Sequence, residues 1–449
     1  METGYRPLPP TGIDYLCSAV KRTATRHALG RIATIASDCI WVSGLSRVAC
    51  VGDRVSAYCE RDPPKPGEIV GLEGELVRVV LEGSADGLSL GARMQLQGPT
   101  QLAPDDSWIG RVLDANGAPF DERPLRPGLV DRTLLAPAPS PINRRLLGPR
   151  LETGMSVFNT LLPLVRGQRL GLFAGSGVGK TTLVARFATN VQADVVVIAL
   201  IGERGREVRE FVERILGPDG LRRTVVVAAT SDQPALVRRR CAWTAMTIAE
   251  HFRDQGRHVL FLADSVTRFA EAHREVAVAA GEGVPARGYP ASTAGLVTAL
   301  CERAGTGTDV QGDITAIFSV LVAGSDMDEP LADLVRGVLD GHVVLSREVA
   351  ETGRYPAVDL VRSVSRSLPD AASPEEIALI NETRKLLGAY EKAELMVRAG
   401  LYTPGADPIT DRAVACWPAL DAFAGRPETV STEASFVALR HALQDPGAA

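Results

Sequence analysis

The feature that most constrains the fold is a glycine-rich segment, AGSGVGKT, at residues 174–181. The apolar run before it, Arg169–Phe173, is typical of a buried strand, and the run after it is typical of a helix through Phe187. In that setting, glycines let successive backbone N–H groups turn inward around an anion, and the start of the helix adds partial positive charge. The segment therefore predicts a phosphate-binding loop between a strand and a helix.

The loop predicts Mg²⁺·ATP as the ligand and its hydrolysis as the activity. Lys180 is expected to reach the β- and γ-phosphates, and the Thr181 hydroxyl to coordinate Mg²⁺. The predicted nucleotide-binding residues of the loop are Gly175, Ser176, Gly177, Val178, Gly179, Lys180, Thr181 and Thr182. Ala174 replaces the first glycine of the usual pattern, but it needs only an ordinary negative φ. A glycine-rich turn without a ligand is the alternative, and the Gly-Lys-Thr ending disfavours it.

Apolar runs separated by helix-length segments continue from about Gln101 to Arg366. The runs are Arg169–Phe173, Val195–Ile201, Thr224–Ala229, Val259–Ala263, Ile314–Val322 and Val343–Leu345. Strands that are apolar on both faces and alternate with helices indicate a buried, mostly parallel sheet.

Two of these runs end on acidic residues. Val259–Ala263 leads to Asp264, which should lie beside the phosphate loop, because parallel sheets bind ligands beyond the carboxyl ends of their strands. We expect Asp264 to hold Mg²⁺, and a helix N-cap is its alternative role. Val195–Ile201 leads to Glu203, expected to polarise the attacking water, and to Arg204, expected to neutralise developing charge. A surface Glu–Arg pair is the alternative.

The region before the sheet has a different pattern. Its short β-type runs are Arg31–Ile35, Cys39–Val42, Val51–Tyr58, Glu68–Val70 and Glu75–Leu81. Closely spaced short strands between turns indicate a small barrel. Further upstream, Ile13, Leu16 and Val20 fit one face of a short amphipathic helix.

After Leu368 the pattern predicts helices only. Ser373-Pro374-Glu375-Glu376 is a capping box with proline at the first helical position, and Gly400 is placed to end that helix. The sequence therefore predicts an N-terminal amphipathic segment (1–27), a β-barrel domain (28–97), an α/β ATPase domain (98–368) and a C-terminal helical domain (369–449).

Composition excludes some classes of protein. No stretch approaches the roughly 20 apolar residues that cross a bilayer, and the N-terminus lacks a secretory signal, so a cytoplasmic location is expected. Seven dispersed cysteines without CxxC spacing indicate neither a disulfide framework nor a zinc site. The net charge of −5 argues against an obligate nucleic-acid binder.

Longer motifs resemble the rotary and type III secretion ATPases. They are GRVLDANGAPFD (110–121), RLGLFAGSGVGKTTL (169–183), LIGERGREVREF (200–211), ADSVTRFAEAHRE (263–275), GYPASTAGLVTALCERAG (288–305) and YPAVDLVRSVSR (355–366). Residues 151–180 and 399–423 are most similar to the flagellum-specific ATPases of type III protein export. The acidic DELSEED segment of catalytic ATP synthase subunits is absent.

The resemblance implies a RecA-like P-loop core and roles for particular residues. Glu203 matches the catalytic glutamate of that family, and Arg366 matches the arginine finger that reaches a neighbouring subunit's γ-phosphate. Tyr355 matches the aromatic residue that stacks on adenine, while a core tyrosine is its alternative role.

The resemblance also implies a homohexamer that energises export of flagellar proteins, peripherally attached to the inner membrane. Expected partners are a negative regulator on the N-terminal segment, export-gate membrane proteins, a stalk protein and chaperone–substrate complexes, without nucleic acid. A non-flagellar (injectisome) secretion ATPase and a Rho-like RNA translocase are the alternatives. The latter needs base-stacking aromatics, and the barrel region offers only Trp41 and Tyr58. A non-catalytic ring subunit is disfavoured because Lys180, Glu203, Asp264 and Arg366 are all present.

Overall fold

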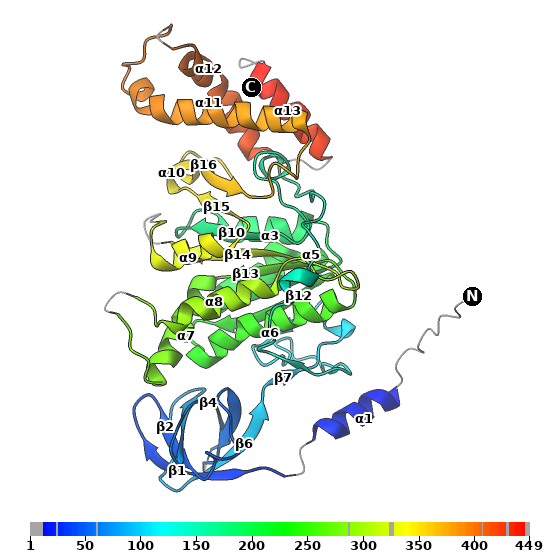
Figure 1. Cartoon of the computed structure of the whole chain (residues 1–449), viewed down its shortest axis with the longest axis vertical. Helices are drawn as coiled ribbons and strands as arrows, with labels where there is room; N and C mark the ends of the chain where they lie inside the picture. The colour runs from blue at the N-terminus through cyan, green and yellow to red at the C-terminus, as the bar shows by residue number, and fades with distance from the viewer. Residues whose placement is uncertain are drawn as a thin grey trace, which may run out of the picture.

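The computed structural model describes residues 12–23, 26–59, 62–285, 288–322, 327–405, 407–427 and 431–444. Residues 1–11 of the predicted N-terminal segment lie outside these ranges. Along the long axis of the molecule, a β-barrel, an α/β core and a bundle of helices follow one another (Figure 1). The predicted fold class is confirmed. Within the described residues, no helix is long and apolar enough to span a membrane.

Six antiparallel strands close the barrel in the order β1-β2-β5-β4-β3-β6. They are β1 (Leu29–Ile35), β2 (Ile40–Ser43), β3 (Asp53–Ala57), β4 (Lys65–Glu73), β5 (Leu76–Leu81) and β6 (Arg93–Pro99). Side chains alternate across each strand, so β5 buries Val77, Val79 and Leu81 inside the barrel and turns the residues between them outward. The helix α1 (Gly12–Arg22) precedes the barrel in the chain, and its Tyr15 and Arg22 contact Asp105 and Asp131, which follow the barrel.

The core is an eight-stranded sheet in the order β16-β15-β10-β14-β13-β11-β12-β8. All neighbours are parallel except β15 and β16. The strands are β8 (Val112–Leu113), β10 (Arg169–Ala174), β11 (Val195–Glu203), β12 (Thr224–Thr230), β13 (Val259–Asp264), β14 (Ile314–Leu321), β15 (Gly341–Leu345) and β16 (Val358–Ser365). A separate pair joins β7 (Gln101–Leu102) to β9 (Arg132–Thr133). The predicted, mostly parallel sheet is confirmed.

Helices bury both faces of this sheet. On β11, Val196 and Ile198 pack into the same apolar core as α3, whereas Val195 and Val197 pack against α6. This two-sided burial explains why the strand is a continuous apolar run. The helical elements are α2 (Ser156–Asn159), α3 (Lys180–Asn190), α4 (Gly205–Glu210), a π-helical turn (Phe211–Leu216), α5 (Gly217–Leu221), α6 (Ala235–Asp254), α7 (Val266–Ala279), α8 (Ser292–Arg303), α9 (Pro330–Val338) and α10 (Arg347–Glu351).

The C-terminal helices are α11 (Pro374–Arg398), α12 (Pro408–Gly425) and α13 (Thr432–Gln444). The predicted capping box is present, since Ser373 and Glu376 each accept a hydrogen bond from the other's backbone N–H. Gly400 follows the end of α11 with φ +69°, as expected for a helix terminator. Strand β16 was not predicted. Its exposed positions, such as Val361 and Val364, interrupt the continuous burial that marks the other core strands.

Three buried histidines predict acid sensitivity of the fold. Burial lowers the pKa of His251, His258 and His273 to about 4 in each case. An unfolded chain protonates histidine below about pH 6.5, so stability present above that pH is lost progressively as pH falls towards 4. The expected loss is about 1–2 kcal/mol per histidine at pH 5.

Thermal unfolding measured between pH 7 and 5 checks this expectation. His258, whose ring nitrogen lies 2.8 Å from the Thr315 hydroxyl, is the best site for substitution. His258→Gln is expected to make the melting temperature less dependent on pH, whereas the exposed His441→Gln is expected to leave that dependence unchanged. An unchanged slope in His258→Gln would contradict the assignment.

Candidate active site

The glycine-rich segment connects β10 to α3 at the carboxyl edge of the sheet. Gly177 and Gly179 have φ of +79° and +84°, a left-handed conformation that a side chain would strain. Gly179 precedes the first residue of α3, so the loop amides and the helix N-terminus face the same space. Ala174 ends β10, is buried and does not have a positive φ, as the sequence predicted.

The loop opens onto a cavity of roughly 770 Å³. Seven of the eight loop residues predicted from the sequence line it: Gly175, Ser176, Gly177, Gly179, Lys180, Thr181 and Thr182. Val178 does not line this cavity, because its side chain is buried in the apolar core.

Two strand ends bring carboxylates to Lys180. The Lys180 ammonium forms an ion pair with the Asp264 carboxylate and lies 4.0 Å from a Glu203 oxygen. Asp264 is buried at the end of β13 and also accepts a 2.7 Å hydrogen bond from the Ser319 hydroxyl. The neighbouring Ser265, not Asp264, caps α7, so the N-cap alternative for Asp264 is wrong.

Glu203 experiences an unusual electrostatic environment. Burial, followed by repulsion from the Asp264 carboxylate, raises the pKa of Glu203 to about 7, although the Lys180 ammonium lowers it. A carboxylate with a pKa near neutrality is well matched to accepting a proton from water at cellular pH. Glu203 does not pair with Arg204, which is exposed and forms a 2.9 Å ion pair with Glu207 at the rim of the cavity.

The residues present fit a magnesium ion. Two carboxylates face one ammonium, and Thr181, Glu203 and Asp264 line one side pocket, so a cation there would relieve the repulsion that raises the pKa of Glu203. Among the described residues there is no cluster of three or more His, Cys, Asp or Glu that could hold a metal. A single carboxylate and a hydroxyl suit Mg²⁺, which usually completes its coordination with waters and phosphates.

Two arginines that line the cavity were not predicted from the sequence. Arg268 and Arg238 both line it, paired with Glu271 at 2.8 Å and Glu275 at 2.9 Å respectively. Arg268 lies one turn into α7, and Arg238 lies in the first turn of α6. Both helices start at carboxyl ends of core strands, and this position was the signal that could have identified them.

The strand β16 separates Tyr355 from Arg366, the other two residues that the sequence predicts to belong to the site. Leu345 pairs with both Ala174 and Val358, so the start of β16 lies at the phosphate-loop edge of the sheet. Tyr355 precedes this strand, is 47% exposed and has its ring against Gly179, so the core-tyrosine alternative is wrong.

Arg366 lies at the opposite edge of the sheet from the phosphate loop, where the parallel strands begin. It follows Ser365, which pairs with Gly341 at the beginning of β15. The eight residues of β16 span roughly 25 Å, and Arg366 donates hydrogen bonds to the Leu339 and Arg336 carbonyls. The structure therefore does not bring Arg366 to the phosphate loop of its own chain.

A phosphate loop on a parallel sheet, with carboxylates at neighbouring strand ends, defines the class of P-loop nucleotide-binding proteins. Comparison with known families agrees. Residues 154–365 match the nucleotide-binding domain of the ATP synthase alpha/beta family, and residues 372–441 match the T3SS EscN ATPase C-terminal domain.

Individual relatives are similar over nearly the whole chain. A flagellum-specific ATP synthase of Caulobacter vibrioides is 43% identical over 96% of this chain and 99% of the relative. A type 3 secretion system ATPase of Xanthomonas euvesicatoria is 42% identical over 83% of this chain and 85% of the relative. The assembled ATPase EscN from enteropathogenic E. coli is 36% identical, with TM-scores of 0.85 alone and 0.83 in complex with its central stalk EscO. Each alignment covers 92% of this chain and 100% of EscN.

The chain belongs to the ATP synthase alpha/beta family, among the flagellum-specific ATP synthases and type III secretion ATPases. It is an ATPase of the type III export class.

Proposed function

We propose that this chain works as a homohexameric ring that energises type III export of flagellar proteins, releasing chaperones and delivering unfolded substrates to a membrane export gate. One observation carries the ring proposal: the Lys180 ammonium meets the Glu203 and Asp264 carboxylates beside the phosphate loop, while Arg366 lies at the opposite edge of the sheet. A head-to-tail arrangement lets one subunit's Arg366 complete its neighbour's site. The assembled form of EscN supports this arrangement.

The proposed roles follow from the chemistry of each group. The loop amides and Lys180 would bind the β- and γ-phosphates, and Thr181 and Asp264 would hold Mg²⁺, which neutralises phosphate charge when bound. Glu203 would orient the attacking water and accept its proton. Arg204, at the cavity rim, would neutralise charge that develops on the leaving phosphate.

Tyr355 would stack on the adenine base. Its half-exposed ring lies against Gly179, beside the loop that would hold the phosphates. Tyr355→Ala is expected to weaken ATP binding by about 5- to 100-fold, the range for loss of one base–aromatic stack. Tyr355→Phe, which keeps the ring, is expected to bind normally. Titration with a fluorescent ATP analogue measures both, and equal affinity of Tyr355→Ala and wild type would remove the stacking role.

Assembly is tested by the dependence of activity on protein concentration. If Arg366 acts in trans, ATP turnover per chain should rise with concentration as rings form, and then reach a plateau. Steady-state phosphate release, measured beside mass photometry of the same samples, gives both quantities. Constant turnover per chain from monomer to ring would contradict a site shared between subunits.

The proposed partners occupy different surfaces. The helix α1 contacts residues 105–131 through polar side chains, including Tyr15 and Arg22. Its apolar stripe, Ile13, Leu16 and Val20, is 68–72% exposed, which suits binding of a negative regulator. The complex of EscN with its central stalk supports a stalk protein as a further partner. The C-terminal helices would face the export gate and the chaperone–substrate complexes, with the ring on the cytoplasmic side of the inner membrane.

The injectisome and RNA alternatives make different predictions. Deletion of the gene in its native bacterium is expected to abolish motility and secretion of flagellar proteins. Intact motility with loss of another type III secretion activity would favour the injectisome alternative. An RNA translocase is not favoured, because the Arg78 guanidinium lies 4.4 Å from the centre of the Trp41 ring and occupies a face of the ring on which a base would have to stack.

A further inference from the structure

The barrel joins the core through buried ion pairs. Glu68 on β4 accepts hydrogen bonds from two consecutive arginines of α6, Arg239 at 2.6 Å and Arg240 at 3.2 Å. All three residues are buried. Buried ion pairs fix geometry, since moving either partner leaves an uncompensated charge. The barrel is therefore held in one orientation on α6.

From Arg239 a chain of hydrogen bonds continues through the core. The Arg239 guanidinium lies 3.4 Å from His273 Nδ1, and His273 Nε2 lies 2.8 Å from the Ser292 hydroxyl. Ser292 in turn donates from its hydroxyl to Glu282 at 2.5 Å and from its backbone N–H to the same carboxylate at 2.9 Å. The chain connects the barrel to the first residue of α8.

Each proton in this chain has one consistent position. A guanidinium can only donate, so His273 Nδ1 accepts, and a neutral ring then carries its proton on Nε2. Burial keeps His273 neutral by lowering its pKa to about 4. The Ser292 hydroxyl donates to Glu282, and its oxygen accepts from His273. The direction of every hydrogen bond is thus fixed by the arginine at one end and the carboxylate at the other.

The loop between α7 and α8 is also held by a second barrel strand. Arg78 on β5 donates to the backbone carbonyl of Ala280, with its guanidinium stacked on Trp41. The N-cap residue of α8 makes no side-chain hydrogen bond, and the Glu282 carboxylate instead accepts one from the Ser292 backbone N–H. Glu282, which follows α7, is thereby joined to the start of α8. Two independent barrel contacts therefore converge on one loop.

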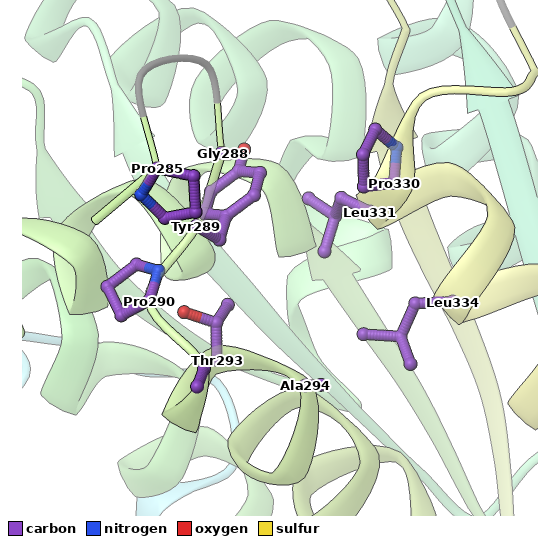
Figure 2. Close-up of a pocket in the computed structure, with 10 residues that line it drawn as sticks. Pro285, Gly288, Tyr289, Pro290, Thr293, Ala294, Pro330, Leu331 and Leu334 are labelled. Carbon is purple, nitrogen blue, oxygen red and sulfur yellow. The ribbon is translucent and has the colours of Figure 1, made fainter. Parts of the chain in front are cut away.

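That loop carries Tyr289, which lines both the nucleotide cavity and an apolar pocket of about 650 Å³. Figure 2 shows Pro285, Tyr289 and Pro290 on one side of this pocket, and Leu331 and Leu334 of α9 on the other. A shift of the loop would therefore change the wall of the nucleotide cavity.

We propose that Glu282, Ser292, His273 and Arg78 are positioning residues for ATP hydrolysis, through which the barrel sets the position of the Tyr289 loop beside the nucleotide. They touch neither the phosphate loop nor the predicted catalytic groups. In this proposal the barrel does more than form part of a ring, because it also fixes the position of one wall of the active site. The catalytic consequence rests on the proposed function, whereas the coupling between barrel and loop does not.

The experiment compares Arg78→Met and Glu282→Gln with a matched control, Arg47→Met. Arg47 is on the same barrel, but its 3.7 Å pair with Glu75 is almost fully exposed. Arg78→Met keeps the apolar stem while removing the donors to Ala280. Hydrogen exchange of the first turn of α8 and of Gly281 reports on the loop, and steady-state kinetics and nucleotide titration report on the site.

Both loop variants are expected to exchange the Ser292 amide about tenfold faster and to lower kcat by about 3- to 10-fold, with the affinity for ATP unchanged. Arg47→Met should match wild type in every measurement. Unchanged exchange in Arg78→Met would overturn the coupling, and faster exchange with wild-type kcat would overturn the positioning role. If wild-type protein hydrolyses no ATP, the proposed function fails, and the exchange result still decides whether barrel and loop are coupled.

Discussion

Arg366→Ala is expected to lower ATP turnover by about 10³- to 10⁵-fold while leaving nucleotide binding nearly unchanged. The reason is topological: the antiparallel strand β16 puts Arg366 at the edge of the sheet that lies away from its own phosphate loop. Its hydrogen bonds to the Leu339 and Arg336 carbonyls position the side chain, and Arg366 forms no ion pair within the described part of the chain. The loss should therefore appear in kcat, measured by phosphate release.

Mixing variants tests whether the arginine acts in trans. Arg366→Ala subunits retain Lys180, and Lys180→Ala subunits retain Arg366, so an interface between them in the correct order has a complete site. In random one-to-one rings about a quarter of interfaces are complete, so activity should recover towards a quarter of wild type.

Two controls accompany this experiment. Arg366→Lys keeps the charge without the planar fork, so its activity should be intermediate. Arg398→Ala removes only an exposed pair with Glu394 and should stay within about twofold of wild type. No recovery in mixed rings, although both variants are shown to co-assemble, would mean that Arg366 does not work between subunits.

Glu203→Gln and Lys180→Ala are expected to separate hydrolysis from binding. Glu203→Gln should lower hydrolysis by about 10²- to 10⁴-fold with ATP affinity retained, because a neutral amide cannot accept the proton of the attacking water. Lys180→Ala should lose both properties, since it removes the ammonium expected to contact the β- and γ-phosphates and leaves Asp264 and Glu203 without their shared cation.

Single-turnover phosphate release and fluorescent-nucleotide titration measure the two effects separately. Glu213→Gln, on the exposed 2.8 Å pair with Arg209, is the matched control and should behave as wild type. Substantial hydrolysis by Glu203→Gln would transfer the role of general base to another group.

The sequence predicted those site residues that directly follow a buried strand. Glu203 and Asp264 end buried apolar runs, and in a parallel sheet the ends of such runs share one edge. Arg238 and Arg268 were missed because only the start of their helices at the carboxyl ends of core strands marks them as cavity residues, and their neighbours in the sequence carry no further signal. Strand β16 was missed for a related reason, since three of its eight residues are exposed and its apolar pattern is broken.

By itself, the sequence determined the phosphate loop, the parallel sheet behind it, and the barrel and helices on either side. These follow from glycine geometry, capping chemistry and the period of apolar residues, all of which act between near neighbours in the chain. Only the tertiary structure decided that Tyr355 and Arg366, eleven residues apart, occupy opposite edges of the sheet. It alone joined Glu68 of the barrel to Arg239 of the core, because contacts between groups 171 residues apart depend on how whole elements pack.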